Sequence, residues 1–245
     1  MTVLQSDITI NVDGSSMPAF VARPDPGSGP HAAIIVLQEI FGVNKEVKRI
    51  TDLVASAGYV GLAINYYHRS HPELNEPYSD EGLQRGFSAA ANVSRATLRS
   101  DVSAAIEWLN AQEYVKKAKI ATWGFCFGGT VAFLTATLPG LAGAVCFYGG
   151  SIASPLPNGE PEALADANDI ACPLLLVYGG ADQWIGPDDV ARTNKVLAAA
   201  GKDFQVQEYP DVGHAFFRES SAHMHSGAVA DAWDLVQAFF KRVFA

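Results

Sequence analysis

Six continuous apolar runs constrain what this chain can fold into more than any other feature of its sequence. They occupy residues 32–38, 59–65, 119–124, 143–149, 173–179 and 204–209, and segments with helical spacing of apolar residues lie between them. Runs of this length without polar alternation are typical of strands that are buried on both faces, as in parallel sheets. The sequence therefore predicts a sheet that helices cover on both sides.

The N-terminal segment follows a different pattern. Residues 7–12 and 17–22 alternate between polar and apolar positions, and Asp13 and Gly14 lie between them. Alternation on both sides of an Asp-Gly turn predicts an antiparallel hairpin. We therefore expect the α/β class, with a mostly parallel central sheet of about eight strands that opens with this hairpin.

The chain has 245 residues, of which 49% are hydrophobic, and this suits one large α/β domain over residues 1–245. The sequence contains no internal repeat and no recognisable interdomain linker. Residues 154–173 are rich in proline, glycine and acidic residues, and we expect them to form a surface excursion.

Charge and composition narrow the function classes. With 17 Lys and Arg against 26 Asp and Glu, the formal net charge is -9, and the clustered cations that hold nucleic acid are absent from the sequence. No apolar window is long enough to span a bilayer. The first 16 residues lack the basic and apolar regions of a secretory signal, so we expect a cytoplasmic protein without a membrane partner.

The chain has three cysteines at widely separated positions, an odd number that argues against a disulfide framework. Cys146 and Cys172 lie beside apolar runs, where a cysteine usually acts as a small buried hydrophobe. We expect both to be core residues. Cys126 has a different context.

The run at 119–124 continues into the string GFCFGG at residues 124–129, followed by an apolar segment with helical character. Small residues two before and two after Cys126 are typical of a nucleophile elbow, here with cysteine where serine is usual. Such a turn would lift the thiol above the carboxyl edge of the sheet, over the N-terminus of the next helix, which favours a thiolate. The N–H of Phe127 would face a developing oxyanion.

A nucleophile of this kind needs a base and a residue that orients the base. In folds with this elbow they follow in the order nucleophile, acid, histidine. Asp182 follows the run at 173–179, and His214 lies between the run at 204–209 and the last helical segment. We therefore predict Asp182 as the acid and His214 as the base.

Three other aspartates compete with Asp182. Asp188 and Asp189 come directly after a proline at an expected helix start, where acidic residues cap the helix or complement its dipole. Asp211 follows a proline in a turn and is expected to be structural.

The remaining histidines give no metal site. His31 lies in a polar segment, whereas His68 with His71 and His223 with His225 have short spacings that could ligate a metal. No third or fourth ligand accompanies either pair in the sequence. We predict neither a metal nor another cofactor.

The string QEIFGVN at residues 38–44 follows the run at 32–38. Glu39 would be poorly solvated at the end of a buried strand, so its charge needs a partner or a proton. A salt-bridged or capping carboxylate remains an alternative. In a fold with a nucleophile elbow this loop usually contributes the second oxyanion-hole N–H, which places Glu39 beside Cys126 and aims the N–H of Ile40 inward.

Together, QEIFGVN, GFCFGG, Asp182 after its strand and GHAFFR at residues 213–218 closely resemble the dienelactone hydrolase (carboxymethylenebutenolidase) family of the α/β-hydrolase superfamily. The resemblance covers nearly the whole chain. It implies the α/β-hydrolase fold and a carboxylic ester hydrolase activity. The string NYYHRSHPELNEPY at residues 65–78 departs from the usual sequence of the family. The resemblance therefore does not define the residues of the pocket wall or the substrate.

The resemblance implies a role for each matching residue. Cys126 would be the nucleophile, His214 the general base and acid, and Asp182 the residue that orients the imidazole. Glu39 would hold the resting thiol and take its proton when substrate arrives.

Other implied roles concern the substrate. The N–H groups of Ile40 and Phe127 would form the oxyanion hole, and Arg218 would bind a substrate carboxylate. A second arginine should follow the fourth strand, where Arg85 is the candidate and Arg69 its rival.

The implied reaction is attack of a thiolate on an ester or lactone, formation of a thioester and hydrolysis. A thiol needs a good leaving group, which favours a dienelactone-like, unsaturated lactone bearing a carboxylate, hence an anionic substrate. One alternative is a broad carboxylesterase or thioesterase, since the fold alone does not fix the substrate. Another is a small-molecule receptor without catalysis. The resemblance also implies a monomer.

Overall fold

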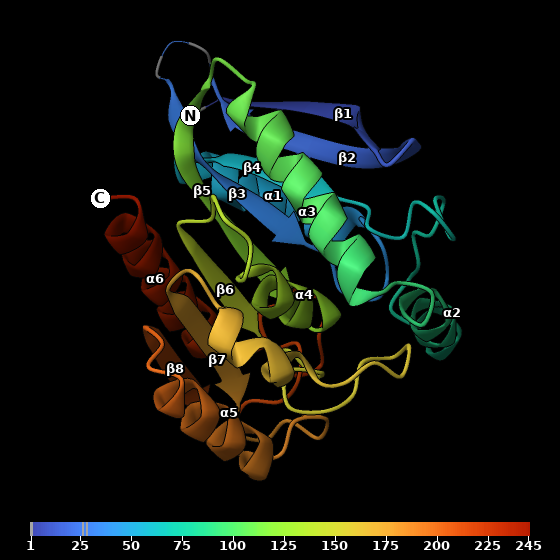
Figure 1. The fold of residues 1–245 in the computed structure, drawn as a ribbon, viewed down its shortest axis with the longest axis vertical. Coiled ribbons are helices and arrows are strands. Elements are labelled where there is room, and N and C mark those ends of the chain that lie inside the picture. The colour runs from blue at the N-terminus through green and yellow to red at the C-terminus, as the bar shows by residue number, and fades with distance from the viewer. Residues whose placement is uncertain (1, 26, 28) are drawn as a thin grey trace.

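The computed structural model, which describes residues 2–25, 27 and 29–245, contains one eight-stranded sheet with the order β1-β2-β4-β3-β5-β6-β7-β8 (Figure 1). The first three strands in this order pair antiparallel, and the pairs from β4 to β8 are parallel. The strands are β1 (Val3–Val12), β2 (Ser15–Pro24), β3 (His31–Leu37), β4 (Val60–Ile64), β5 (Val115–Phe125), β6 (Gly143–Phe147), β7 (Leu174–Gly179) and β8 (Phe204–Tyr209).

Helices lie on both faces of this sheet. In Figure 1, α3 crosses the near face and α1 lies behind the strands. The helices are α1 (Lys45–Ser56), α2 (Asp80–Ala90), α3 (Arg95–Asn110), α4 (Phe127–Thr135), α5 (Pro187–Ala199), α6 (Ser226–Val243) and the short 3-10 helix η2 (Ala163–Asp169). The predicted fold class is therefore confirmed: a mostly parallel sheet with an N-terminal hairpin and helices around it.

The sequence correctly located every strand, but one strand has a different environment from the one expected. Strands β4, β6 and β7 are buried along their whole length, as their continuous apolar runs predict. Strand β8 is half-buried to exposed, because it forms the edge of the sheet and pairs only with β7. Its polar residues at alternate positions, Gln205 and Gln207, fit an edge better than a buried strand.

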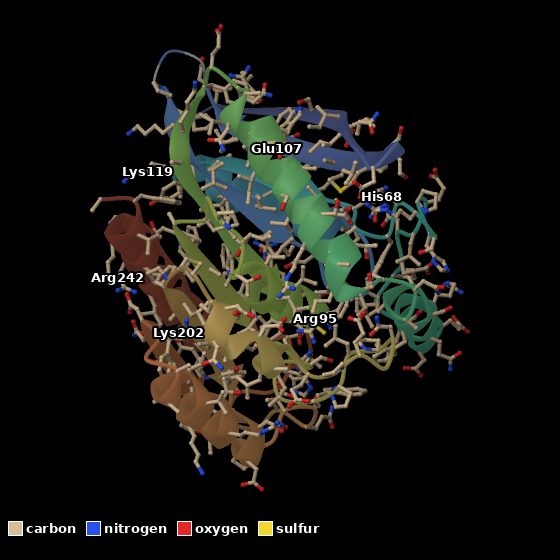
Figure 2. The ribbon with its side chains drawn as sticks, viewed as in Figure 1. His68, Arg95, Glu107, Lys119, Lys202 and Arg242 are labelled. Carbon is tan, nitrogen blue, oxygen red and sulfur yellow. The ribbon has the colours of Figure 1, made fainter. Side chains whose placement is uncertain are left out.

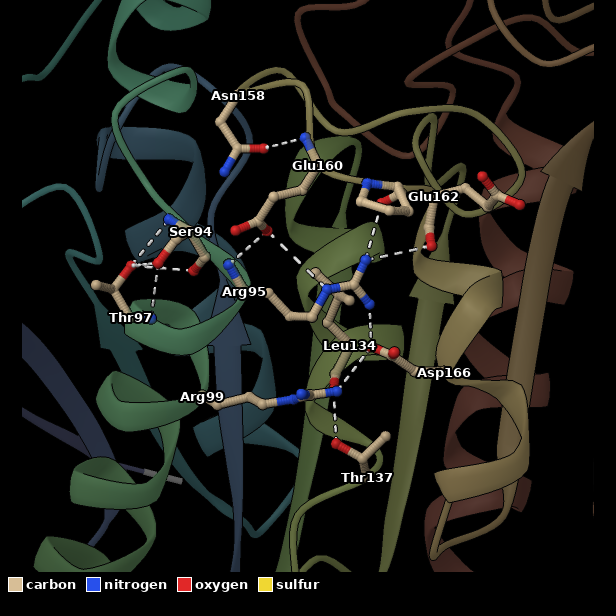
Figure 3. A network of polar contacts seen from close by, with 11 residues as sticks. Ser94, Arg95, Thr97, Arg99, Leu134, Thr137, Asn158, Glu160, Glu162 and Asp166 are labelled. Atoms are coloured by element: carbon tan, nitrogen blue, oxygen red, sulfur yellow. Dashed lines mark hydrogen bonds and ion pairs between the residues drawn. The ribbon is translucent and has the colours of Figure 1, made fainter.

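The segment 154–173 is more ordered than a surface excursion suggests. It contains η2, and its apolar side chains Ala163, Leu164 and Ala167 are buried. Figure 3 shows how α3 holds it: Arg95 and Arg99 both pair with Asp166 of η2. These ion pairs fix the segment to helix α3.

The anchored segment matters because it reaches the edge of the sheet where the strands end. The backbone N–H of Arg95 donates to Glu160 over 2.9 Å, and the Arg95 guanidinium donates to the carbonyl of Pro161 over 2.8 Å. Ser154 and Pro157, in the same segment, line the cavity described below.

In the described part of the chain, no helix combines the length and the apolar character needed to cross a bilayer.

Candidate active site

Cys126 stands at the turn between β5 and α4, in a backbone conformation that L residues rarely adopt, with φ of 54° and ψ of -119°. The neighbouring glycines permit this turn. A Cβ on Gly124 would lie 1.9 Å from the carbonyl oxygen of Gly128, and a Cβ on Gly128 would lie 2.2 Å from that of Leu37. The string GFCFGG therefore folds as a tight, strained elbow, with the strain concentrated at the cysteine.

The elbow also places Cys126 at a helix N-terminus. The Cys126 N–H donates to the carbonyl of Phe147 in β6 over 3.0 Å, which ties the turn to the sheet. Helix α4 begins at Phe127, so the first N–H groups of the helix lie next to the thiol. Cys126 is partly exposed, whereas Cys146 and Cys172 are buried.

The two buried cysteines are the core residues that the sequence predicts. Burial raises the pKa of the Cys172 thiol to about 12 and that of Cys146 well above its usual value. Both thiols are therefore protonated and inert near neutral pH.

His214 and Asp182 meet at the same edge of the sheet. The imidazole Nδ1 lies 2.7 Å from Oδ2 of Asp182, whose side chain is fully buried. The other carboxylate oxygen accepts the backbone N–H groups of Trp184 and Ile185 over 2.8 and 3.2 Å. This geometry leaves Nε2 of His214 as the nitrogen directed away from the carboxylate. The backbone is strained here too, because Ala215 has a φ of 57°.

Burial works against a charged imidazole, but the Cys126 thiolate and the Asp182 carboxylate outweigh burial and raise the pKa of His214 to about 10. The imidazole of His214 is therefore positively charged near neutral pH. Cys126 and His214 line the same cavity.

Glu39 is buried in the loop after β3, as expected, and it forms an ion pair with Arg218. Nη1 of Arg218 lies 3.4 Å from Oε2 of Glu39, and the guanidinium stacks 3.8 Å from the centroid of the Tyr78 ring. Burial first, and the negative charge of Glu39 second, raise the pKa of Tyr78. This contact matches the alternative prediction for Glu39, which is a salt-bridged carboxylate.

One cavity of about 460 Å³ brings these groups together. Its lining includes Cys126, His214, Glu39, Arg218, Ile40 and Phe127. Asp182 supports His214 from behind the cavity wall. The structure thus gathers the predicted nucleophile, base, acid, glutamate and oxyanion-loop residues at the carboxyl edge of the sheet.

The oxyanion positions lie on two different elements. Phe127 is the first residue of α4, so its N–H has no partner within the helix. Ile40 lies in the loop after β3 and packs against α2, since a Cβ on Gly86 would lie 2.6 Å from the Ile40 carbonyl oxygen. Both residues line the cavity beside Cys126.

The structure does not bring the second candidate arginine to this cavity. Arg85 is about half exposed and pairs with Glu76 over 2.5 Å, in a separate shallow hollow next to Ser88. Its rival Arg69 pairs with Asp13 and Asp101. The expectation for Arg85 is corrected because the side chain extends from α2 toward Glu76 and away from the thiol.

The histidines outside the site have structural partners. His68, labelled in Figure 2, lies between Ser15 and Asp101, and His225 accepts the N–H of Ala228 at the start of α6. No group of three or more metal-ligating side chains occurs in residues 2–25, 27 and 29–245.

The competing aspartates also have other positions. Asp189 accepts the backbone N–H of Gly186 over 3.2 Å and so closes the N-terminus of α5, in whose first turn Asp188 also lies. Asp211 is exposed in the turn after β8.

Sequence reasoning missed three aromatic residues of the cavity. Tyr78 stacks on Arg218, and Phe87 and Trp184 lie on α2 and in the loop after β7. Trp184 could have been noticed because it follows Asp182 by two positions. Tyr78 belongs to the string at residues 65–78 that left the pocket wall open, and Phe87 carries no local signal. Both residues reach the site only through the tertiary fold.

This elbow and the sheet order define the class of the protein, which is an α/β hydrolase. The profile of the Dienelactone hydrolase family matches residues 17–244. The chain therefore belongs to the dienelactone hydrolase family, as the sequence motifs indicate.

Individual proteins that are similar to this chain carry names from the same family. A provisionally named carboxymethylenebutenolidase of Synechocystis sp. is 31% identical over 234 residues, covering 96% of this chain and 95% of the relative. One of Escherichia coli (strain K12) is 31% identical over 235 residues, covering 96% and 85%. The crystal structure of a provisionally named dienelactone hydrolase from Klebsiella pneumoniae superposes with a TM-score of 0.89 at 28% identity, covering 98% of this chain and 99% of that one.

Proposed function

We propose that this protein hydrolyses a carboxylic ester or a lactone through a thioester on Cys126. The observation that carries the proposal is the shared cavity, in which a strained thiol faces an imidazole whose other nitrogen is 2.7 Å from a buried carboxylate. A nucleophile, a base and an orienting acid in this arrangement are the elements of acyl transfer.

The first half-reaction forms the acyl-enzyme. The thiol proton resides on Nε2 of His214, and the thiolate sulfur of Cys126 attacks the carbonyl carbon. The carbonyl oxygen takes the negative charge and accepts hydrogen bonds from the backbone N–H groups of Ile40 and Phe127. When the intermediate collapses, the C–O bond to the leaving group breaks, His214 gives its proton to that oxygen, and a thioester remains.

The second half-reaction releases the acid. His214, now neutral, takes a proton from water while the water oxygen attacks the thioester carbonyl. Collapse breaks the C–S bond, the carboxylic acid leaves, and the thiolate–imidazolium pair is restored. Asp182 holds the imidazole in the tautomer that this cycle requires and stabilises its positive charge.

Thiol chemistry restricts the leaving group. A thiolate is a better leaving group than an ordinary alkoxide, so the intermediate collapses forward only when the departing oxygen is stabilised, as in an enol lactone or an aryl ester. The family resemblance favours a carboxylate-bearing unsaturated lactone held by Arg218. A broad specificity for esters is the second candidate, and the pairing of Arg218 with Glu39 favours it.

The acyl-enzyme can be tested directly. Wild-type protein mixed with a good ester substrate and quenched in acid should gain the mass of the acyl group, and peptide mapping should locate it on Cys126. Hydroxylamine, which cleaves thioesters, should remove the added mass.

The variant Cys126→Ala should show neither adduct nor turnover. Cys172→Ala serves as the matched control, because it removes a thiol that is buried and lies outside the cavity. Unchanged turnover of every ester and lactone in Cys126→Ala would refute the catalytic proposal and leave a small-molecule receptor as the alternative.

A further inference from the structure

Two of the three exposed large hydrophobic side chains in residues 2–25, 27 and 29–245 stand at the mouth of the Cys126 cavity. Trp184 is 56% exposed and Phe87 is 42% exposed, and both line that cavity. The third, Met224, is 46% exposed and does not line it. Scattered exposed hydrophobic residues are common, but two aromatic rings at one catalytic cavity form a concentrated apolar patch.

The two rings come from distant parts of the chain and meet across the opening. Their centroids are 6.2 Å apart, and the ring planes are inclined by 43°. Phe87 is on α2, and Trp184 is in the loop between β7 and α5. The spacing and tilt fit an aromatic pair that can present its open faces to a further flat group.

Each ring is fixed through a residue of the proposed catalytic machinery. The backbone N–H of Trp184 donates to Oδ1 of Asp182, the same carboxylate that holds His214. Gly86, the residue before Phe87, packs against the carbonyl of Ile40 so closely that a Cβ would lie 2.6 Å from it. These contacts anchor the backbone that carries each ring close to Asp182 and the oxyanion loop.

The charges of the cavity disfavour an anionic substrate. Arg218 is already paired with Glu39 and stacked on Tyr78. Asp80 adds a carboxylate to the lining near α2, while Arg85 lies elsewhere. A carboxylate entering this cavity would meet the negative charges of Glu39 and Asp80 as well as the positive charge of Arg218, whereas an uncharged group would meet no repulsion.

We propose that the Phe87–Trp184 pair binds an uncharged aromatic group of the substrate, and that the protein prefers neutral aryl esters to esters bearing a carboxylate. This inference rests on the proposed function and specifies its substrate class. A cavity of about 460 Å³ has room for an acyl chain at Cys126 and a ring at the mouth.

Three esters of butanoic acid test the preference. The 4-acetylphenyl ester is neutral and aromatic, the 4-carboxyphenyl ester is aromatic and anionic, and the trifluoroethyl ester has no ring. We expect kcat/KM for the neutral aryl ester, divided by the rate of its alkaline hydrolysis to correct for the leaving group, to exceed the same ratio for the anionic ester by about tenfold, as one unfavourable charge contact would produce. A preference for the anionic ester would overturn the proposal.

Variants test the ring pair. Trp184→Ala and Phe87→Ala should each raise KM for the 4-acetylphenyl ester by about tenfold, with kcat changed by less than about twofold. The trifluoroethyl ester should be unaffected, and Trp184→Phe should restore most of the loss. Met224→Ala, the matched exposed control, should behave as wild type. An equal loss for the ringless ester would mean that the rings support the fold or Asp182 rather than the substrate.

Binding without chemistry separates this inference from the proposed function. Calorimetric titration of 4-hydroxyacetophenone into Cys126→Ala should show binding that Phe87→Ala weakens by about tenfold. Ring-dependent binding without turnover of any ester would refute the hydrolase and keep the aromatic site. Turnover without any dependence on Phe87 or Trp184 would refute the aromatic site and keep the hydrolase.

Discussion

The protein contains two histidine–aspartate pairs that look alike and differ in their surroundings. His214 lies 2.7 Å from Asp182, and His68 lies 3.1 Å from Asp101; both carboxylates are fully buried. His68 even has a serine at its other nitrogen, because Oγ of Ser15 lies 3.0 Å from Nδ1. On residue types alone, Ser15, His68 and Asp101 would pass for a catalytic triad.

The difference lies in what surrounds each imidazole. His214 is 14% exposed and lines the cavity with Cys126, whereas the His68 side chain is fully buried. Arg69 closes the His68 pair from outside by donating to Asp101 over 2.7 Å. The proposed acyl transfer requires a nucleophile and open space next to the imidazole, and only His214 of the two histidines has both.

The largest expected effect compares the two imidazoles. His214→Ala should reduce kcat/KM for 4-acetylphenyl butanoate by about 10⁴-fold, because the base and its orientation are lost together. His68→Ala should change kcat/KM per folded molecule by less than about twofold, since His68 has no access to the cavity. Initial rates with the folded fraction determined by circular dichroism measure both. A loss of similar size in His68→Ala would erase the distinction between the pairs.

For the stability of the fold, we expect the His68–Asp101 pair to matter more than the His214–Asp182 pair. Asp101→Ala should lower the free energy of unfolding by about 3 kcal/mol, because Arg69 and His68 lose their common buried partner. Urea unfolding measures this effect. Asp101→Asn, which keeps one acceptor oxygen, should lose less than half as much. If Asp101→Ala is as stable as wild type, the His68 pair has no structural role.

The pKa of His214 should report the proximity of Cys126 to the imidazole. Because the folded value of about 10 lies above the usual 6.5, the charged imidazole contributes to stability fully below pH 6.5, and this contribution is lost as the pH rises toward 10. Nitrogen NMR of the imidazole should therefore find His214 protonated at pH 8. In Cys126→Ala the midpoint should move down, because the thiolate no longer favours the charge. A midpoint that is the same in both proteins would argue against the thiolate–imidazolium pair.

The smallest expected effect concerns Glu39, a third buried carboxylate, which pairs with an arginine instead of a histidine. Since Glu39 is paired with Arg218, Glu39→Gln should change the rate of Cys126 alkylation by iodoacetamide by about twofold only. His214→Ala should slow alkylation much more. A large change of rate and of its pH profile in Glu39→Gln would restore the role that the family resemblance implies, in which the glutamate holds the resting thiol.

Much of the fold and site could be predicted from the sequence where the signal is local. The elbow requires glycine at 124 and 128 because neighbouring backbone atoms fill the space that a side chain would need. The motif can therefore be recognised within six residues of sequence. Asp182 and His214 could be found because the strand order determines which loops meet at the carboxyl edge. Strand β8 was placed correctly but its burial was not, since the position of a strand at the edge depends on the whole sheet.

Contacts between segments that are far apart in the chain could not be predicted from local sequence patterns. The partner of Glu39 is Arg218, 179 residues further along the chain, and no spacing rule predicts such a pair. Arg85 seemed suitable for a substrate because it lies on a helix after the fourth strand. The direction of its side chain toward Glu76 depends on the packing of α2, which the sequence does not express locally.

By itself, the sequence determined the class of sheet and the strained elbow at Cys126, and it predicted that Asp182 and His214 accompany this elbow, because periodicity and glycine sterics act over a few residues. Only the tertiary structure decided which charges neutralise one another, which histidine–aspartate pair opens onto a cavity, and that Phe87 and Trp184 meet at its mouth. These features depend on distances between segments far apart in the chain, and such distances exist only once the helices and loops have packed around the sheet.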